Sequence, residues 1–370
     1  MNKRNLLIII IILLAIIAGI RIIFQTKTTF KQSEMNFAVA DTASITKIFL
    51  ADMDGNTVLL ERTTENDWKL NSKYTAQQYV VQNFLRTLMY LTVRAPVALP
   101  ARDNTLKHMS ALATKVEIYQ QKYLIDFWGI KWFQREKLTK TFYVGDNTQD
   151  NIGTYMKMED SDTPFIVYIP GFRGFVHTRF STNSYEWRDQ TVFNLFMQEI
   201  ETVELIYPQE PEKSFRIENL DNNNFKVFSF HQNKYLEKID TMNTINYLGG
   251  FVEARFEYFI PDKDKHIADS LLSIQSFQEL KVTTKDGKVY EMITYLKPNT
   301  LTEEELEAKF FQTSDYLWDR ERLYAFVGTE MDLVSIQYYV FGRILKPIQY
   351  FEYGYTEKLI EGLHIQELGN

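Results

Sequence analysis

The sequence predicts an α+β fold in which an N-terminal transmembrane helix precedes two repeated units, each a mixed sheet with packed helices. Three observations predict this class. An unbroken apolar run lies near the N-terminus, strand-like and helix-like patterns alternate after it, and their order recurs after about 155 to 163 residues. The predicted parts are a short tail (1–4), a transmembrane anchor (5–24), a linker (25–36), a first α+β unit (37–193), a second unit (194–355) and a C-terminal tail (356–370).

Composition bounds the classes of function. The chain has 370 residues, of which 45% are hydrophobic and 24% charged, as in a globular protein long enough for two domains. The net charge of −7 argues against a nucleic-acid partner, because neutralising phosphates requires a basic face. The absence of cysteine excludes disulfides, thiolate nucleophiles and zinc sites of the cysteine type.

The apolar run extends from Leu6 to Phe24, with Arg21 as its one charge. At about 1.5 Å per residue it is roughly 28 Å long, close to the thickness of a bilayer core. A buried core helix and a cleavable signal peptide are the alternatives, but the length of the run and the lack of an A-x-A site favour an uncleaved anchor. Because a short tail normally stays inside, we expect a single-pass inner-membrane protein with a periplasmic bulk.

The first unit opens with a hairpin pattern. Two apolar runs, Ile45–Leu50 and Val58–Leu60, flank the turn pair Asp54-Gly55. Asp52 and Asp54 resemble the start of a calcium loop, but the later ligands of an EF-hand are missing. A hairpin is therefore the prediction for this stretch.

A strand at Trp68–Leu70 is followed by an amphipathic pattern over Tyr74–Val93. Thr75 is the expected N-cap, and Pro96 and Pro100 are expected to end the helix.

The same order of patterns returns in the second half of the chain, which predicts an internal duplication. The matched stretches are Ile200–Leu205 with Ile45–Leu50, Phe225–Val227 with Trp68–Leu70, a helix over Ile239–Phe251, Phe277–Val282 with Thr114–Tyr119, and a second Asp-Gly turn at Asp286-Gly287. The acidic stretch Glu303–Glu307 is interpreted as a solvated helix start.

The stretch Gly145–Gly153, GDNTQDNIG, has the residue types of an ion site and also of a turn. Its spacing differs from that of an EF-hand, and no helix begins after Gly153 to receive a phosphate. Alternating residues on both sides, Phe142–Val144 and Tyr155–Met158, predict a hairpin loop between paired strands.

Motifs of known chemistry are missing. The five histidines form no metal-binding pair, and the chain has no G-x-S-x-G, P-loop or G-x-G-x-x-G motif. We therefore predict no catalytic residue, no metal ligand and no cofactor. Two clusters have the residue types of either an anion-binding clamp or a structural contact: Trp187, Arg188 and Asp189, and Trp318, Asp319 and Arg320.

The run I-x-K-I-x-L, L-x-R and W-x-L (Ile45–Leu70), followed by YVG, GTYM, YIPG and WRD, resembles the domain-of-unknown-function family 4340. The resemblance extends over most of Phe37–Phe351. It implies an extracytoplasmic protein with one N-terminal membrane helix, related to domains in auxiliary subunits of gliding-associated ABC transporters. It implies no catalytic residues.

Three hypotheses about function follow. The first is a non-enzymatic, membrane-tethered component that binds envelope proteins, among them ABC transporter components. The second is a glycan- or lipid-binding envelope module that uses the aromatic side chains. The third is a hydrolase whose carboxylates come from distant parts of the chain.

Overall fold

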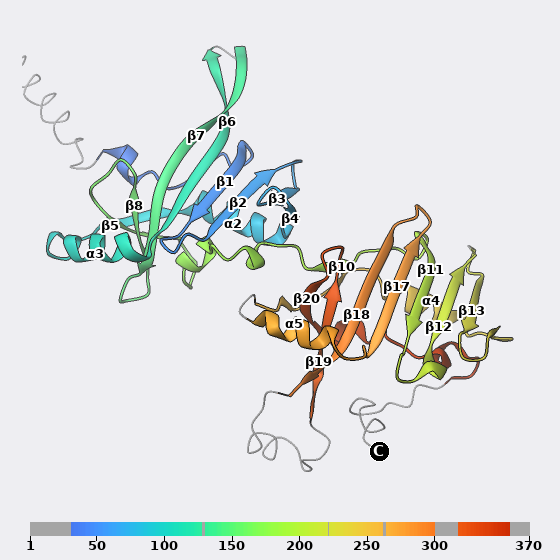
Figure 1. Cartoon of the computed structure of the whole chain (residues 1–370). Coiled ribbons are helices and arrows are strands. Elements are labelled where there is room, and N and C mark those ends of the chain that lie inside the picture. Colours follow the sequence, from blue (N-terminus) through green and yellow to red (C-terminus); the bar gives the residue numbers. More distant parts are fainter. Residues whose placement is uncertain (1–30, 128–129, 221, 262–263, 300–316, 356–370) are drawn as a thin grey trace, which may run out of the picture. The chain divides into compact units, whose positions relative to one another are not determined.

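The computed structural model describes residues 31–127, 130–220, 222–261, 264–299 and 317–355 (Figure 1). The chain divides into two compact units, Met1–Asp189 and Gln190–Asn370. The sequence had placed this boundary between residues 193 and 194. Each unit is built around one nine-stranded sheet.

In the first unit the strand order is β4-β3-β2-β1-β6-β7-β8-β9-β5. Strands β1 to β4 form a meander that ends at one edge, and β5 lies at the opposite edge. The strands are β1 (Ile45–Ala51), β2 (Thr57–Arg62), β3 (Trp68–Leu70), β4 (Tyr74–Thr75), β5 (Thr92–Pro96), β6 (Thr114–Phe127), β7 (Ile130–Asn147), β8 (Thr154–Met158) and β9 (Phe165–Tyr168).

The second unit repeats this order as β14-β13-β12-β11-β17-β18-β19-β20-β16. A small separate sheet pairs β10 (Thr191–Phe193) with β15 (Ala254–Arg255). The remaining strands are β11 (Ile200–Ile206), β12 (Phe215–Asn219), β13 (Phe225–Ser229), β14 (Lys234–Tyr235), β16 (Tyr258–Phe259), β17 (Gln278–Thr284), β18 (Val289–Pro298), β19 (Trp318–Val327) and β20 (Asp332–Gln337).

Helices occupy matching places in the two chain orders. In each unit the first helix follows the meander and leads to the strand at the opposite edge of the sheet. The second helix leads from that edge strand back into the sheet. The helices are α2 (Gln78–Tyr90), α3 (Leu99–Leu112), α4 (Thr241–Gly249), α5 (Lys265–Leu272) and α7 (Tyr338–Phe341). Short 3-10 turns are η1 (Gln32–Met35), η2 (His177–Phe180), η3 (Ser184–Glu186), η4 (Pro211–Lys213) and η6 (Ile348–Phe351).

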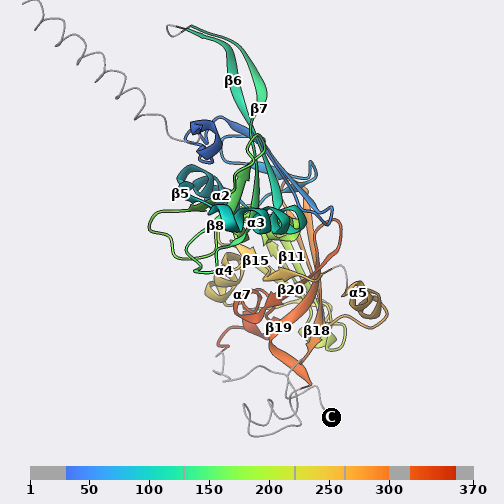
Figure 2. The ribbon, with the colours of Figure 1, turned by 90° about the vertical axis from the view of Figure 1, so that its left-hand side faces the viewer.

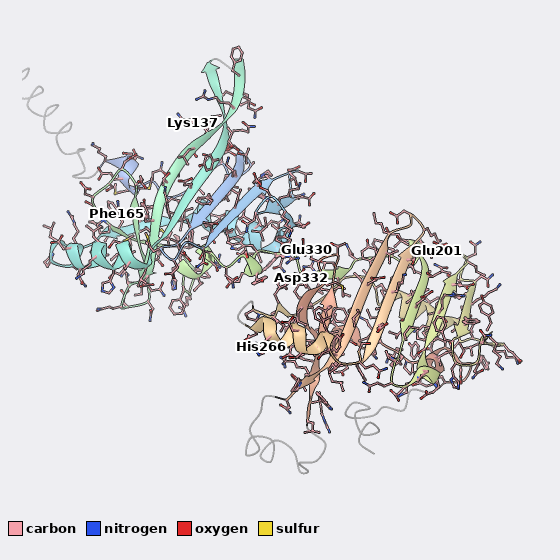
Figure 3. All side chains as sticks on the ribbon, viewed as in Figure 1. Lys137, Phe165, Glu201, His266, Glu330 and Asp332 are labelled. Atoms are coloured by element: carbon pink, nitrogen blue, oxygen red, sulfur yellow. The ribbon has the colours of Figure 1, made fainter. Side chains whose placement is uncertain are left out.

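The core of the first unit lies between its sheet and α2. Val81, Phe84 and Leu88, at helical spacing on α2, are buried in one cluster with sheet residues such as Phe142 and Phe165 (Figure 3). In the second unit a smaller cluster joins α5 to the sheet, with Leu271 packed against residues of β18 and β19. Apolar burial on this scale is the main stabilising term of such sheets.

The structure corrects the predicted class. The sheets are not mixed, because every strand pair that the structure describes is antiparallel. The alternation of strand and helix patterns had been interpreted as mixed sheets with packed helices. Instead, α2 and α4 each carry the chain from one edge of an antiparallel sheet to the other. The described chain is mostly antiparallel β-sheet with few helices.

The predicted transmembrane helix also requires correction. No helix in the described ranges is long and apolar enough to cross a membrane. The predicted anchor, Leu6–Phe24, lies outside those ranges, as do the acidic stretch Glu303–Glu307 and the predicted C-terminal tail. The assignment as a single-pass inner-membrane protein with a periplasmic bulk therefore has no support in the structure.

The local predictions had mixed outcomes. Both Asp-Gly hairpins are confirmed, and Gly55 and Gly287 adopt the positive φ angles, 87° and 83°, that these turns require. The predicted helix Tyr74–Val93 was too long. Tyr74 begins strand β4. Gln77 rather than Thr75 occupies the N-cap position of α2, without a side-chain capping hydrogen bond, and the helix ends at Tyr90. Helix α3 was not predicted, and Pro100 lies in its first turn.

The stretch Gly145–Gly153 forms a hairpin, as predicted, but the loop is shorter, because β7 continues to Asn147, which pairs with Thr154 of β8. Strands β7 and β8 pair through Val144 and Met156, and the Thr148 amide donates to the Gly153 carbonyl at 2.8 Å. Both glycines lie where a side chain would not fit. A Cβ on Gly145 would lie 2.9 Å from Cγ of Met109 on α3, and a Cβ on Gly153 would lie 2.5 Å from Cγ2 of Ile166. The glycines therefore allow close packing at these two positions.

Candidate functional site

The first predicted cluster is part of the core of the first unit. Trp187 is 2% exposed, and its ring meets that of Phe84 edge-on with centroids 5.0 Å apart. Its Nε1 donates to the Ser181 carbonyl at 2.9 Å. The Arg188 guanidinium lies 3.8 Å above the centroid of Tyr74, and the Asp189 amide donates to the Thr75 carbonyl at 2.9 Å. These contacts hold the end of the unit against β4.

The second predicted cluster lies at the start of β19, in a different place in the fold. Trp318 opposes Pro298 across β18 and β19 and is half-buried. Asp319 follows it, and Arg320 is also half-buried on the same strand. By strand order β19 corresponds to β8, whereas Trp187 lies beyond β9. The similar residue types therefore do not mark equivalent positions in the two units.

Asp319 belongs to a group of four charged residues that we call the β18–β20 charge cluster: Glu257, Lys297, Asp319 and Arg322. Lys297 Nζ lies 3.1 Å from Asp319 Oδ2, and both side chains are largely buried. Asp319 Oδ1 accepts the backbone amides of Glu321 and Arg322 at 2.9 and 3.2 Å. Each cation of the cluster is paired with a carboxylate, and the exposed Glu321 carboxylate also lies 3.3 Å from Arg322 Nη1.

Arg322 and Glu257 form the second pair of the cluster. Arg322 Nε and Nη2 donate to the two carboxylate oxygens of Glu257 at 2.7 and 3.1 Å. These hydrogen bonds hold the pKa of Glu257 below its usual value of 4.5 and raise that of Arg322. Glu257 is therefore ionised at neutral pH and unsuited to act as a general acid. The geometry is that of a structural contact between β19 and the segment that precedes β16.

The Glu257–Arg322 pair gives a pH-dependent prediction. Because the folded-state pKa of Glu257 is lowered, its contribution to stability is present above pH 4.5 and is lost as the pH falls through the folded-state value. We expect Glu257→Gln to lower the free energy of unfolding by about 1–2 kcal/mol at pH 7. The difference from wild type should shrink in urea titrations at pH 3. A difference that is the same at pH 3 and pH 7 would contradict this account.

Other described surfaces have fewer groups that could bind a ligand or a metal ion. No group of three or more His, Asp or Glu side chains in the described ranges is arranged to hold a metal ion. A depression of about 260 Å³ lies beside the β17–β18 turn, where Asp286 and Lys288 pair at 3.0 Å with both side chains exposed. Its lining residues are Leu195, Glu199, Thr284, Lys285, Asp286, Lys288 and Tyr290.

The most distinctive feature of the first unit is a projecting hairpin. Strands β6 and β7 have 14 and 18 residues, whereas their outer neighbours β1 and β8 have 7 and 5. Pairing with β1 ends at Gln120, and pairing with β8 begins at Phe142. Between these points β6 and β7 pair only with each other in the described chain (Figures 1 and 2). We call residues 121–138 the arm.

Most side chains described on the arm are exposed, and Gln121 at its base is half-buried. Phe133 is 69% exposed, Leu138 42% and Tyr123 38%, and charged residues lie among them, including Lys137 (Figure 3). At its base, Glu136 accepts hydrogen bonds from Thr46 and Lys47 of β1, both at 2.6 Å. Seven residues of strand, from Gln121 to Phe127, extend roughly 20 Å. The arm therefore carries aromatic and cationic groups well beyond the sheet.

The second unit has no such arm at the equivalent place. There the hairpin of β17 and β18 turns at Asp286-Gly287, directly after the sheet. Our sequence interpretation missed the arm because it searched for polar turns, whereas the run YLIDFWGIKWF around Gly129 is largely apolar. The signal available was the length of two alternating runs on either side of that glycine.

Comparison with protein families identifies the chain. A model of the family described as "Domain of unknown function (DUF4340)" matches residues 68–273, more than half of the chain. The chain belongs to the DUF4340 family. This confirms the resemblance seen in the sequence, over a shorter range. The DUF4340 match begins in β3 and ends just after α5, so it includes the arm and spans the division between the two units. Comparisons with curated proteins and with solved structures gave no match.

Proposed function

We propose that this member of the DUF4340 family is a non-enzymatic interaction component of a protein complex, and that the arm is its contact element. The observation that carries the proposal is the arm itself. An isolated two-stranded hairpin is marginally stable in water, so one that extends far beyond its sheet gains stability from a bound partner. Its exposed Phe133 and Tyr123 are of the residue types that dominate protein interfaces.

The charged residues support the same function. Each cation of the β18–β20 charge cluster is paired with a carboxylate, and the ionised Glu257 supplies no acid. The arm, in contrast, exposes cations beside aromatic and apolar groups. Such a mixture suits a protein surface with an apolar centre and a charged rim. Transporter components, which the family resemblance implies, are among the partners we propose.

A photo-crosslinking experiment on the full chain tests this function. Benzoylphenylalanine at position 133 is expected to give a discrete protein adduct in cells. The matched control is the same group at Tyr79, which is 73% exposed on α2 of the same unit and should give none. A second copy of the chain or a different protein would each count as a partner.

A shortened variant shows whether the arm itself is responsible. Replacing residues 122–135 by Asn-Gly leaves the paired residues Gln121 and Glu136 next to a two-residue turn. We expect this variant to keep the wild-type thermal midpoint, because Glu136 still contacts β1. Excess wild-type chain should compete for the adduct, and excess shortened chain should not. Equal competition by both chains, or no adduct at position 133, would refute the proposed function.

A further inference from the structure

The two Asp-Gly hairpin turns have the same closing hydrogen bond. We call residues 52–56 the first turn and residues 284–288 the second turn. In each, the amide of the first residue donates to the carbonyl of the fifth, at 3.1 Å in the first turn and 2.9 Å in the second. Gly55 and Gly287 also have nearly equal φ angles, 87° and 83°. The two turns are therefore a matched pair whose side-chain contacts can be compared.

The second turn engages both its aspartate and its glycine. The two carboxylate oxygens of Asp286 are used separately: Oδ1 accepts the Thr284 hydroxyl, and Oδ2 lies 3.0 Å from Lys288 Nζ. The hydrogen bond from Thr284, followed by that from Lys288, lowers the pKa of Asp286 to about 2. The Gly287 amide donates to the Thr284 carbonyl at 2.8 Å. Neither the carboxylate nor the amide that follows it is free to react.

The first turn is held by Asp52 instead. Asp52 Oδ1 accepts the amides of Asp54 and Asn56 at 3.0 and 2.9 Å, and Oδ2 accepts Asn56 Nδ2 at 2.9 Å and the Thr182 hydroxyl at 2.6 Å. Within the part of the chain that the structure describes, the Asp54 carboxylate has no hydrogen-bond or ion-pair partner, and the Gly55 amide donates no hydrogen bond. Both residues are exposed. Here the carboxylate and the following amide are both available.

An aspartate that precedes a glycine can cyclise, because glycine has no side chain to hinder its amide. The glycine nitrogen attacks the aspartate Cγ, a C–N bond forms, the Cγ–O bond breaks, and the oxygen leaves as water with the amide proton. Water then opens the resulting succinimide at either carbonyl. Opening at the backbone carbonyl gives isoaspartate, with an additional methylene in the backbone, and opening at the other carbonyl restores aspartate.

We propose that Asp54 is a site of spontaneous isomerisation to isoaspartate, and that Thr284 and Lys288 protect Asp286 from the same reaction. Cyclisation at Asp54 breaks no hydrogen bond of the carboxylate or of the Gly55 amide, whereas the second turn must give up its contacts first. The reaction starts from the carboxylic acid, and the low pKa of Asp286 makes that form rarer. The first turn lies outside the arm, so this site is independent of the proposed contact function.

Peptide mapping of the aged full chain tests the site. The purified chain is incubated at pH 6 in water enriched in oxygen-18. Isoaspartate is then recognised by its oxygen-18 label and by resistance to a protease that cleaves before aspartate. We expect isoaspartate at position 54 to accumulate about tenfold faster than at position 286. Synthetic peptides of residues 50–60 and 282–292 should react at similar rates, because they lack the contacts of the folded turns.

Variants of the second turn test the protection. Thr284→Val/Lys288→Met removes both partners of the Asp286 carboxylate, so isomerisation at 286 should rise by about tenfold. Lys288→Met alone, at an exposed side chain, should give a smaller rise and provides the test if the double variant does not fold. The negative control is Asp54→Glu, because glutamate would have to close a larger ring. It should abolish labelled isoaspartate at position 54 and leave the rate at 286 unchanged.

Circular dichroism spectra that match those of wild type would show that the aged chain and each variant are folded. Equal rates at the two positions in the folded chain, or a faster rate at 286, would overturn the proposal. A rate at 286 that stayed at the wild-type value in the folded variants would overturn the protective role of Thr284 and Lys288.

Discussion

Replacing Trp187 by alanine is expected to lower the free energy of unfolding of the first unit by about 4 kcal/mol. The side chain is 2% exposed, contacts Phe84 edge-on and donates its indole hydrogen to the Ser181 carbonyl. Truncation removes the buried area, leaves a cavity and orphans the carbonyl. Urea denaturation of the full chain, followed by circular dichroism and tryptophan fluorescence, measures the change.

The control for this prediction is the same substitution in the second cluster. Trp318 is half-buried at the start of β19, so Trp318→Ala removes less buried area and should cost clearly less. The comparison also tests the interpretation of the two clusters. Equal losses at the two positions would mean that the tryptophans have equivalent roles, contrary to their different places in the strand order.

Features set by neighbouring residues could be predicted from the sequence. The Asp-Gly turns were predicted correctly, because only a few residue types adopt the backbone angles of such turns. Gly55 and Gly287 have the positive φ that is required. The spacing of its apolar residues predicted that α2 exists. It did not predict where α2 begins and ends, because β4 lies just before the helix and β5 just after it. Local chemistry therefore predicted the turns and the presence of α2, but not where the helix begins and ends.

Features set by distant contacts could not be predicted in the same way. The direction of strand pairing between β1 and β6 depends on how α2 carries the chain across the sheet, which no local pattern records. Helix α3 has few apolar positions at helical spacing, and only Thr105 and Met109 are buried in it. The close approach of Met109 to Gly145 explains the glycine at this position only after the fold is known.

The candidate site shows the same division. Asp319 was singled out from the sequence. Its partner Lys297, and the pair of Glu257 and Arg322 beside it, could not be predicted, because the register of β18, β19 and β20 brings them together. The arm was missed for a different reason. The arm projects because β1 and β8 are shorter than β6 and β7. The length of one strand relative to its neighbours is set by the whole sheet, so a local sequence pattern does not record it.

The second large effect is expected at the β18–β20 charge cluster. Asp319→Ala should lower the free energy of unfolding of the second unit by about 3 kcal/mol, because it leaves Lys297 buried without its carboxylate. It also removes the acceptor of two backbone amides at the start of β19. Urea denaturation at pH 7 measures this loss. The matched control is Glu291→Ala, whose pair with Lys281 is exposed and should contribute little or nothing measurable.

A double-mutant cycle separates the buried cation from the lost hydrogen bonds. Lys297 is 8% exposed, so in the Asp319→Ala variant its charge is the main cost. Replacing it as well, in Asp319→Ala/Lys297→Met, removes that charge and keeps most of the side-chain volume. The double variant should therefore be more stable than Asp319→Ala alone. If the two substitutions instead destabilised additively, Lys297 and Asp319 would not act as a pair, and the cluster would have to be understood through Arg322 and Glu257 alone.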